Sequence, residues 1–241
     1  MAAHDYDSIV TILDRPTLVL AGPGAGKTRL LGDRVKRLID SGISPEVITI
    51  LTFARDASLH MRTKLLDTKG GFGIPYKDLP NVSTMHSLGF EIINKRPHFI
   101  GLKKADLRVQ ENEDVKSLLY RDAALILGHS QADGDSARHC KQLGDCRPGS
   151  IVPGCSICEK YWNIMAKCNC IDFDDQVLFA CQILESKGDI LAEFQDKCQH
   201  LLVDEYQDIN AAQFRLINLL SLSHREGLFV VGDDAQSIYR F

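Results

Sequence analysis

Small residues, a lysine and a threonine form one short segment whose chemistry suits phosphate binding. The segment comprises Ala21, Gly22, Pro23, Gly24, Ala25, Gly26, Lys27 and Thr28. Small residues let consecutive backbone N–H groups point at phosphate oxygens, and the N-terminus of a following helix adds partial positive charge. In this P-loop pattern, Lys27 would reach the β- and γ-phosphates of a nucleotide, and the Thr28 hydroxyl would hold Mg²⁺. Ala21 departs from the pattern, which places a glycine there.

A pair of acidic residues could complete such a site. Asp204 and Glu205 follow the apolar residues 201–203, which we expect to form a strand. Ligands of open parallel sheets bind at the carboxyl edge, where Asp204 suits the Mg²⁺ shell and Glu205 suits a general base for an attacking water. An exposed acidic turn would explain an Asp-Glu pair alone, but the P-loop in the same chain favours a functional role.

Short apolar runs alternate with helical patterns in both ends of the chain. The helical patterns are apolar stripes within residues 30–39, 57–66 and 211–220. The apolar runs are rich in Val, Leu and Ile without polar alternation, as in strands buried on both faces of a parallel sheet. This order predicts an α/β fold, with a doubly wound parallel sheet flanked by helices. The runs occupy residues 17–21, 47–53, 81–85, 200–205 and 227–233.

The middle of the chain breaks this alternation. Residues 91–171 contain helical stretches, chiefly 111–127 and 158–167, but no convincing buried strand. Residues 133–154 are rich in Gly, Pro, Ser and charge and predict a long loop. We therefore expect a mostly α-helical subdomain at 91–171, inserted into an α/β domain made of residues 1–90 and 172–241.

Six motifs in the expected order resemble those of superfamily 1 DNA helicases of the UvrD/Rep/PcrA type. They are AGPGAGKTRLL, LTFARDASLHM, VSTMHSLGFEII, IDFDDQVL, LLVDEYQDINAAQ and VVGDDAQSIYRF. The resemblance implies a RecA-like P-loop NTPase that uses ATP and Mg²⁺ as an ATP-dependent DNA helicase or translocase. It also implies movement on single-stranded DNA and unwinding of duplexes at junctions, in the 3′ to 5′ direction. The pathway, whether DNA repair, restart or recombination, and the choice of DNA over RNA stay open.

The resemblance assigns roles to further residues. Arg29 would contact the nucleotide, Gln236 would sense the γ-phosphate, and Gln207 and Asp208 would link the acidic motif to its neighbours. Single-stranded DNA would pass Phe53, Thr84 and His86, and its bases would stack near Tyr239 and Phe241. Core packing is an equal alternative for Phe53, because a phenylalanine in a strand is usually buried. Relatives often carry Trp at the position of Phe241.

The helicases of this family close ATP between two RecA-like domains, and arginines of the second domain stabilise the transferring phosphoryl group. Residues 1–241 resemble the first domain alone, so we expect weak nucleotide binding, little hydrolysis and no unwinding from them. Two alternatives are a helicase–nuclease motor and a nucleic-acid-binding module with a degenerate ATPase. The intact Lys27, Thr28, Asp204, Glu205 and Gln236 disfavour the second.

Two departures from the family concern the nucleotide site. Relatives read adenine with a glutamine upstream of the P-loop, whereas this chain has HDYDSIV there, so how adenine is read stays open. Lys64 stands where relatives have an arginine, and lysine keeps the charge but loses the planar fork of the guanidinium.

Composition is that of an ordinary globular protein, with 44% hydrophobic and 25% charged residues. The formal net charge of −4 is not typical of a nucleic-acid-binding protein, so any contacts with nucleic acid must be made by local groups of residues. No apolar run approaches about 18 residues, and the N-terminus lacks the pattern of a signal peptide. We expect a cytoplasmic protein without a membrane partner.

Four of the eight cysteines cluster in the predicted loop region. Cys140, Cys146, Cys155 and Cys158, with His139 adjacent, would suit a tetrahedral Zn²⁺ site. Only one Cys-x-x-Cys pair is present, and the spacing before it is irregular. Reduced thiols in a loop-rich insertion are therefore the favoured interpretation, with zinc as the alternative.

Overall fold

The computed structural model describes residues 8–140 and 155–233. This part of the chain divides into two compact units, each made of segments distant in the sequence. The boundaries expected for a motor domain and a helical insertion stay a prediction, because compactness alone defines neither. The first unit takes in residues 8–85, 191–209 and 217–233, and the second takes in 86–140, 155–190 and 210–216.

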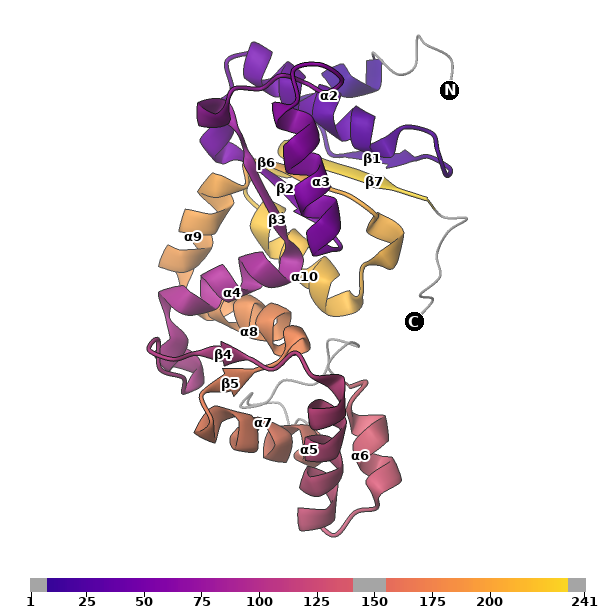
Figure 1. The fold of residues 1–241 in the computed structure, drawn as a ribbon. Helices are drawn as coiled ribbons and strands as arrows, with labels where there is room; N and C mark the ends of the chain where they lie inside the picture. The colour runs from indigo at the N-terminus through magenta and orange to yellow at the C-terminus, as the bar shows by residue number, and fades with distance from the viewer. Residues whose placement is uncertain (1–7, 141–154, 234–241) are drawn as a thin grey trace. The chain divides into compact units, whose positions relative to one another are not determined.

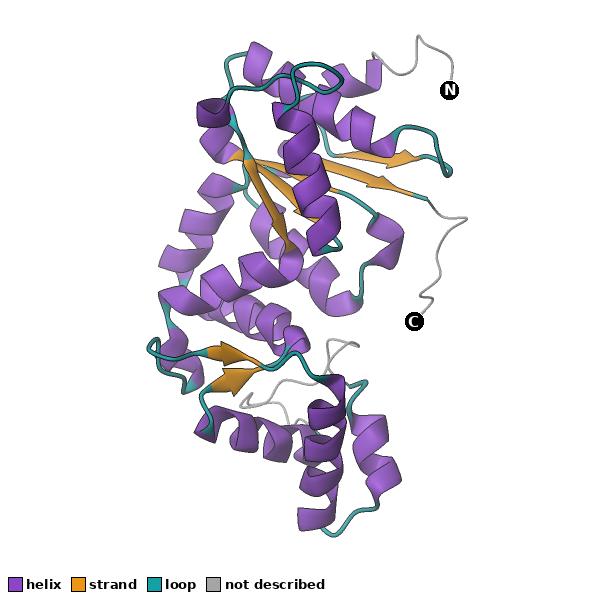
Figure 2. Cartoon of the chain, in the orientation of Figure 1, coloured by secondary structure: helices purple, strands orange, loops and turns teal. Residues whose placement is uncertain are grey.

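A five-stranded parallel sheet forms the centre of the first unit (Figures 1 and 2). The strand order is β1-β7-β6-β2-β3, and every neighbouring pair is parallel. Strand β2 is buried along its whole length, which explains why apolar residues run through it without alternation. The expected α/β fold with a parallel sheet flanked by helices is confirmed. The strands are β1 Thr17–Leu20, β2 Ile48–Thr52, β3 Asn81–Thr84, β6 His200–Val203 and β7 Leu228–Gly232.

Helices α2 and α3 pack on this sheet (Figure 1). The predicted apolar stripe of α2 is buried in the core beside residues of β1, β2 and β7. Among residues 8–140 and 155–233, no helix has the length and apolar character that crossing a bilayer requires. The helices that lie wholly or partly in this unit are α2 Lys27–Asp40, α3 Arg55–Leu66, α9 Gly188–Lys197 and α10 Ala211–Ser221.

One core residue of α2 is charged, which the apolar pattern did not indicate. Arg34 is almost fully buried, and its Nη1 donates a hydrogen bond of 2.7 Å to the carbonyl of Val10. Its guanidinium also lies 5.0 Å from the centre of the Phe229 ring. Burial lowers the pKa of Arg34 to about 10, so the fold bears the cost of a desolvated cation here.

The second unit is mostly helical, as expected of the middle of the chain. Tyr120 of α5 and Tyr161 of α7 stack with ring centres 3.9 Å apart, and the Tyr161 hydroxyl donates to Asp172 at 2.8 Å. Asp172 in turn caps α8 through a capping box with Asp175. Besides the first residues of α9 and α10, this unit contains α4 Met85–Lys95 apart from Met85, β4 Arg108–Val109, α5 Glu113–Ile126, α6 Gln131–Ala137, α7 Ser156–Lys167, β5 Cys170–Ile171 and α8 Phe173–Ser186.

Two features of this unit correct the sequence analysis. Strands β4 and β5 form a small parallel sheet where no strand was expected, because two residues are too short to show a pattern. Helix α6 overlaps the first residues of the loop predicted at 133–154, and it is capped by Ser130 and Asp133 in a capping box. Gly134 contributed to the prediction of a loop. In the structure it allows α6 to pack closely on α5, because a Cβ at this position would lie 2.6 Å from the Tyr120 carbonyl oxygen.

Candidate nucleotide-binding site

The predicted phosphate loop connects β1 to the N-terminus of α2. Gly24 and Gly26 have φ angles of 72° and 86°, a left-handed conformation that favours glycine. Gly26 is the N-cap of α2, and no side chain caps that end of the helix. Lys27 and Thr28 therefore stand in the first turn, beside backbone N–H groups suited to an anion.

Ala21 is accommodated without strain, although the P-loop pattern has glycine there. Its N–H donates to the Gly232 carbonyl at 2.9 Å, which continues the pairing of β1 with β7. The non-glycine residues with positive φ are Asp106, Asn169 and Glu205 in the described chain, so Ala21 needs no glycine conformation.

The acidic pair follows β6 at the carboxyl edge of the same sheet. Asp204 is buried, and its N–H donates to the Leu51 carbonyl at 2.9 Å. Its Oδ1 accepts the N–H of Glu205 at 3.0 Å. Glu205 itself has φ 50° and ψ 50°, a left-handed conformation that is uncommon for a residue with a side chain. Strained backbone of this kind often occurs at functional sites.

The P-loop lysine and the acidic turn meet, although 178 positions separate them in the chain. Lys27 Nζ lies 2.8 Å from Glu205 Oε2. The lysine side chain is 11% exposed and the glutamate side chain is 35% exposed, so solvent reaches the carboxylate. The structure therefore brings Lys27 and Glu205 together at the sheet edge, while the expectation that Thr28 and Asp204 share one metal-bound triphosphate with them stays a prediction.

The pKa values of the two carboxyl groups are shifted in opposite directions. Burial, together with the neighbouring charge of Glu205, raises the pKa of Asp204 to about 6. Partial burial would raise the pKa of Glu205 as well, but hydrogen bonds from Lys27 and Gln207 outweigh it and lower that pKa. Glu205 is thus held as a carboxylate, whereas burial disfavours the ionised form of Asp204.

Gln207 joins the acidic turn to the end of β7. Its Nε2 donates to Glu205 Oε2 at 2.6 Å, and its Oε1 accepts the Asp233 N–H at 2.8 Å. Its Nε2 also lies 3.5 Å from Asp208 Oδ2. Because β7 lies between β1 and β6, its end stands between the P-loop strand and the strand that carries the acidic pair. Gln236 lies just beyond, outside the described residues.

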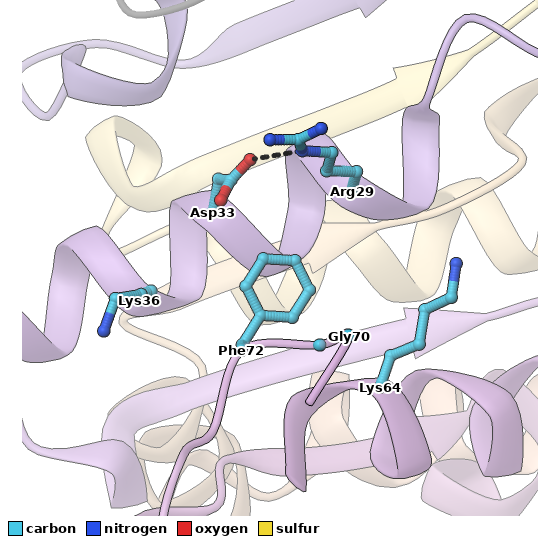
Figure 3. A pocket seen from close by; sticks show the side chains of 7 residues that line it. Arg29, Asp33, Lys36, Lys64, Gly70 and Phe72 are labelled. Carbon is cyan, nitrogen blue, oxygen red and sulfur yellow. Dashed lines mark ion pairs between the residues drawn. The ribbon is translucent and has the colours of Figure 1, made fainter. Parts of the chain in front are cut away.

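Arg29 lines a pocket on the outer side of α2 (Figure 3). Arg29 Nε pairs with Asp33 at 3.6 Å, one helical turn away. The pocket has a volume of about 470 Å³, and Phe72 lies in it between α2 and the helix that carries Lys64. The sequence analysis did not identify Asp33 as a partner, although the i, i+4 spacing of opposite charges on a helix was a usable signal.

The residues expected on a DNA path differ in their exposure and in the elements that carry them. Phe53 follows β2 and is 40% exposed, so the core-packing alternative is wrong for it. Thr84 ends β3 and is buried, whereas His86 lies in α4, in the second unit, 5.5 Å edge-on from the Phe173 ring. Burial lowers the pKa of His86. Tyr239 and Phe241 lie outside the described residues.

A parallel sheet flanked by helices, a glycine-rich loop with Lys27 after β1, and carboxylates after β6, two strands away in the same sheet, define a P-loop NTPase with a RecA-like fold. More narrowly, the chain belongs to the family of the UvrD/REP helicase N-terminal domain, whose family model matches residues 3–144 and 154–241.

Named relatives agree with this membership. The chain is 30% identical to the ATP-dependent DNA helicase Rep of Buchnera aphidicola subsp. Baizongia pistaciae and to that of Escherichia coli K12, over 95% of its own length and 35% of theirs. It is also 30% identical to the ATP-dependent DNA helicase PcrA of Leuconostoc citreum, over 95% of its length and 32% of that protein. The chain thus spans about a third of the length of these curated relatives.

Proposed function

We propose that this chain is the ATP-binding motor portion of an ATP-dependent DNA helicase that moves on single-stranded DNA. The observation that carries the proposal is the contact of Lys27 with Glu205 beside an uncapped P-loop helix. These are the groups that bind a triphosphate and activate water in this class of enzyme. The names of the relatives, ATP-dependent DNA helicases Rep and PcrA, support the substrate class.

The residues of the site fit a magnesium–nucleotide complex. Mg²⁺ prefers oxygen ligands, and Thr28 and Asp204 supply a hydroxyl and a carboxylate. Burial and the neighbouring Glu205 raise the pKa of Asp204 to about 6, and a bound cation would favour its ionised form. When bound, the ion would neutralise charge on the β- and γ-phosphates.

Lys27 would change partner during the cycle. In the structure its ammonium group pairs with Glu205. Phosphate oxygens of ATP would draw Lys27 away, leaving Glu205 as a general base that orients and deprotonates the attacking water. Gln207 holds that carboxylate in place at 2.6 Å, and Gln236 would sense the γ-phosphate.

We further propose that DNA contacts follow the carboxyl edge of the sheet. Phe53 is exposed there, and base stacking on an aromatic ring is tolerant of sequence, as a motor requires. Thr84, His86, Tyr239 and Phe241 are the other proposed contacts, with single-stranded DNA and junctions as substrates and 3′ to 5′ as the direction. Gln207 connects Glu205 to the segment that leads toward Tyr239 and Phe241, which would couple hydrolysis to DNA grip.

We propose that ATP turnover also requires a second RecA-like domain. Arginines from a second domain commonly stabilise the transferring phosphoryl group, with an effect of about 10³–10⁵ in rate. Residues 1–241 by themselves would bind nucleotide weakly and hydrolyse it very slowly.

Binding of a fluorescent ATP analogue with Mg²⁺ tests the core of this proposal. Lys27→Ala should weaken binding at least about tenfold, because the cation that meets the phosphates is lost. Lys104→Ala, an exposed lysine of the second unit, is the matched control and should leave affinity unchanged. Equal affinity of the Lys27→Ala protein and the wild type would refute the assigned site.

A further inference from the structure

Three cysteines of the second unit come together in space. The Sγ atoms of Cys140, Cys155 and Cys158 all lie within 4.8 Å of one another. None of the three is in a disulfide. We propose that these thiols bind one Zn²⁺ ion, a site separate from the nucleotide site and unrelated to the P-loop chemistry.

The distances suit a single ion. Zinc–thiolate bonds are about 2.3 Å, so the sulfurs of a tetrahedral site lie about 3.8 Å apart. Sγ separations of no more than 4.8 Å are compatible with that value. In a cubane iron–sulfur cluster each cysteine binds a different iron, which spreads the sulfurs over a larger body than one ion.

Local structure directs two of the thiols to one side. Cys155 is the N-cap of α7, and Cys158 lies three residues later in its first turn. In the first turn of a helix, residues three apart lie on the same face, which is the geometric basis of the Cys-x-x-Cys pair. The positive end of the helix macrodipole also stabilises negative charge carried by bound thiolates.

The third thiol comes from the end of α6. The Cys140 N–H donates to the Ala137 carbonyl at 3.0 Å, in the turn that ends this helix. The same carbonyl accepts the Cys158 Sγ–H at 3.4 Å, which ties α7 to that turn. Cys168 and Cys170 do not belong to the group, and within the described ranges no fourth Cys, His, Asp or Glu joins it. Cys146, of the cluster noted in the sequence, lies outside the described residues.

A metal here would join two helices that are separated along the chain. Cys140 and Cys155 flank residues 141–154, so one ion would join the two ends of that segment and hold the turn after α6 against the start of α7. Closing a loop by a metal removes entropy from the unfolded chain, so binding stabilises the fold. The proposed role is structural, because the ion would hold the turn after α6 against the first turn of α7.

Metal analysis of protein purified without added zinc is the direct experiment. Wild type should carry about one zinc per chain by elemental mass spectrometry, as a mononuclear site requires. Cys158→Ser and Cys140→Ser should each lose most of it. Cys168→Ser, an exposed cysteine outside the group, is the matched control and should keep the metal in full.

Reconstitution guards against variants that fail to fold. Wild-type protein stripped by a chelator should unfold at a temperature lower by roughly 5–10 °C and recover when zinc is added back. Co²⁺ added to the stripped protein should give the visible absorption of tetrahedral cobalt–thiolate coordination.

Four results would overturn the proposal. They are wild-type protein without zinc or a cobalt spectrum, loss of metal in Cys168→Ser, a disulfide among the three cysteines in freshly purified protein, and the absorption of an iron–sulfur cluster.

Discussion

Lys27 Nζ lies 2.8 Å from Glu205 Oε2, so the group that would bind phosphate is held by the group that would activate water. This contact joins the first turn of α2 to the left-handed turn after β6. A nucleotide must compete for the lysine, and its arrival would release the carboxylate for chemistry. In the site, the ammonium group of Lys27 and the carboxylate of Glu205 thus neutralise each other.

Glu205→Gln should separate binding from hydrolysis. The variant loses the ion pair that occupies Lys27, so affinity for Mg²⁺–ATP should be unchanged or rise a few-fold. Hydrolysis should fall by about 10²-fold or more, since the amide cannot act as the base. Fluorescent-nucleotide titration and phosphate release in the helicase, with and without single-stranded DNA, check both parts. A tenfold loss of nucleotide affinity would contradict the proposed competition.

Asp204→Asn should stabilise the metal-free protein in a pH-dependent way. Because the folded-state pKa of Asp204 is raised to about 6 from 3.8, the folded state binds the proton more tightly than the unfolded state. Wild-type stability therefore falls as pH rises through this window, by up to about 3 kcal/mol. Asparagine cannot ionise and keeps an oxygen for the Glu205 N–H.

Urea unfolding without Mg²⁺ or nucleotide measures this effect. The variant should be more stable than wild type by about 1–3 kcal/mol at pH 8, and the two should converge near pH 4. An advantage that does not change between pH 4 and pH 8 would show that ionisation of Asp204 is not its source.

Gln207→Ala should loosen the link between the acidic turn and β7. The change removes a donor to Glu205 and leaves the buried Asp233 N–H without its acceptor. An unsatisfied buried group costs about 1–3 kcal/mol of unfolding free energy. Gln131→Ala, at an exposed first position of α6, should change stability by less than about 0.5 kcal/mol. Chemical denaturation measures the free energy of unfolding of both variants. Equal values would contradict a structural role for Gln207.

Gly227→Ala should destabilise the sheet strongly. A Cβ at this position would lie 1.7 Å from the Gln199 carbonyl oxygen, a backbone atom that can move only by shifting β6 or β7. Overpacking of this kind costs about 1–3 kcal/mol or more. Gly188→Ala is the control, because nothing lies within 4 Å of a Cβ there. Thermal unfolding should show a lower midpoint for Gly227→Ala alone, and similar midpoints for both would contradict the close approach.

Phe53→Ala should weaken DNA binding without unfolding the protein. The ring is 40% exposed, and loss of one base-stacking platform corresponds to about 1–3 kcal/mol of binding free energy. Phe99→Ala has a similar exposure, 38%, and lies in the second unit. Fluorescence anisotropy with single-stranded oligonucleotides compares the two. A decrease in affinity with Phe99→Ala and none with Phe53→Ala would remove Phe53 from the proposed DNA path.

Much of the fold was readable from local pattern. Unbroken apolar runs predict buried parallel strands, and the P-loop motif predicts the turn after β1. Both patterns depend on residues that are adjacent in the chain. The pattern missed Arg34 in the core, since a charged residue is expected outside and contacts with the Val10 carbonyl and the Phe229 ring compensate its burial. It also missed α6, whose helix is maintained by a capping box and by packing on α5 rather than by composition.

The sequence by itself determined which residues can do chemistry, namely the phosphate loop and the carboxylates after β6. It also determined the family to which the chain belongs. Only the tertiary structure decided which of them meet. The pairing of Lys27 with Glu205, the bridge from Gln207 to β7 and the approach of Cys140 to Cys155 and Cys158 each join residues distant along the chain. Such contacts depend on the order in which strands pair and helices pack, and no local pattern of residues encodes that order.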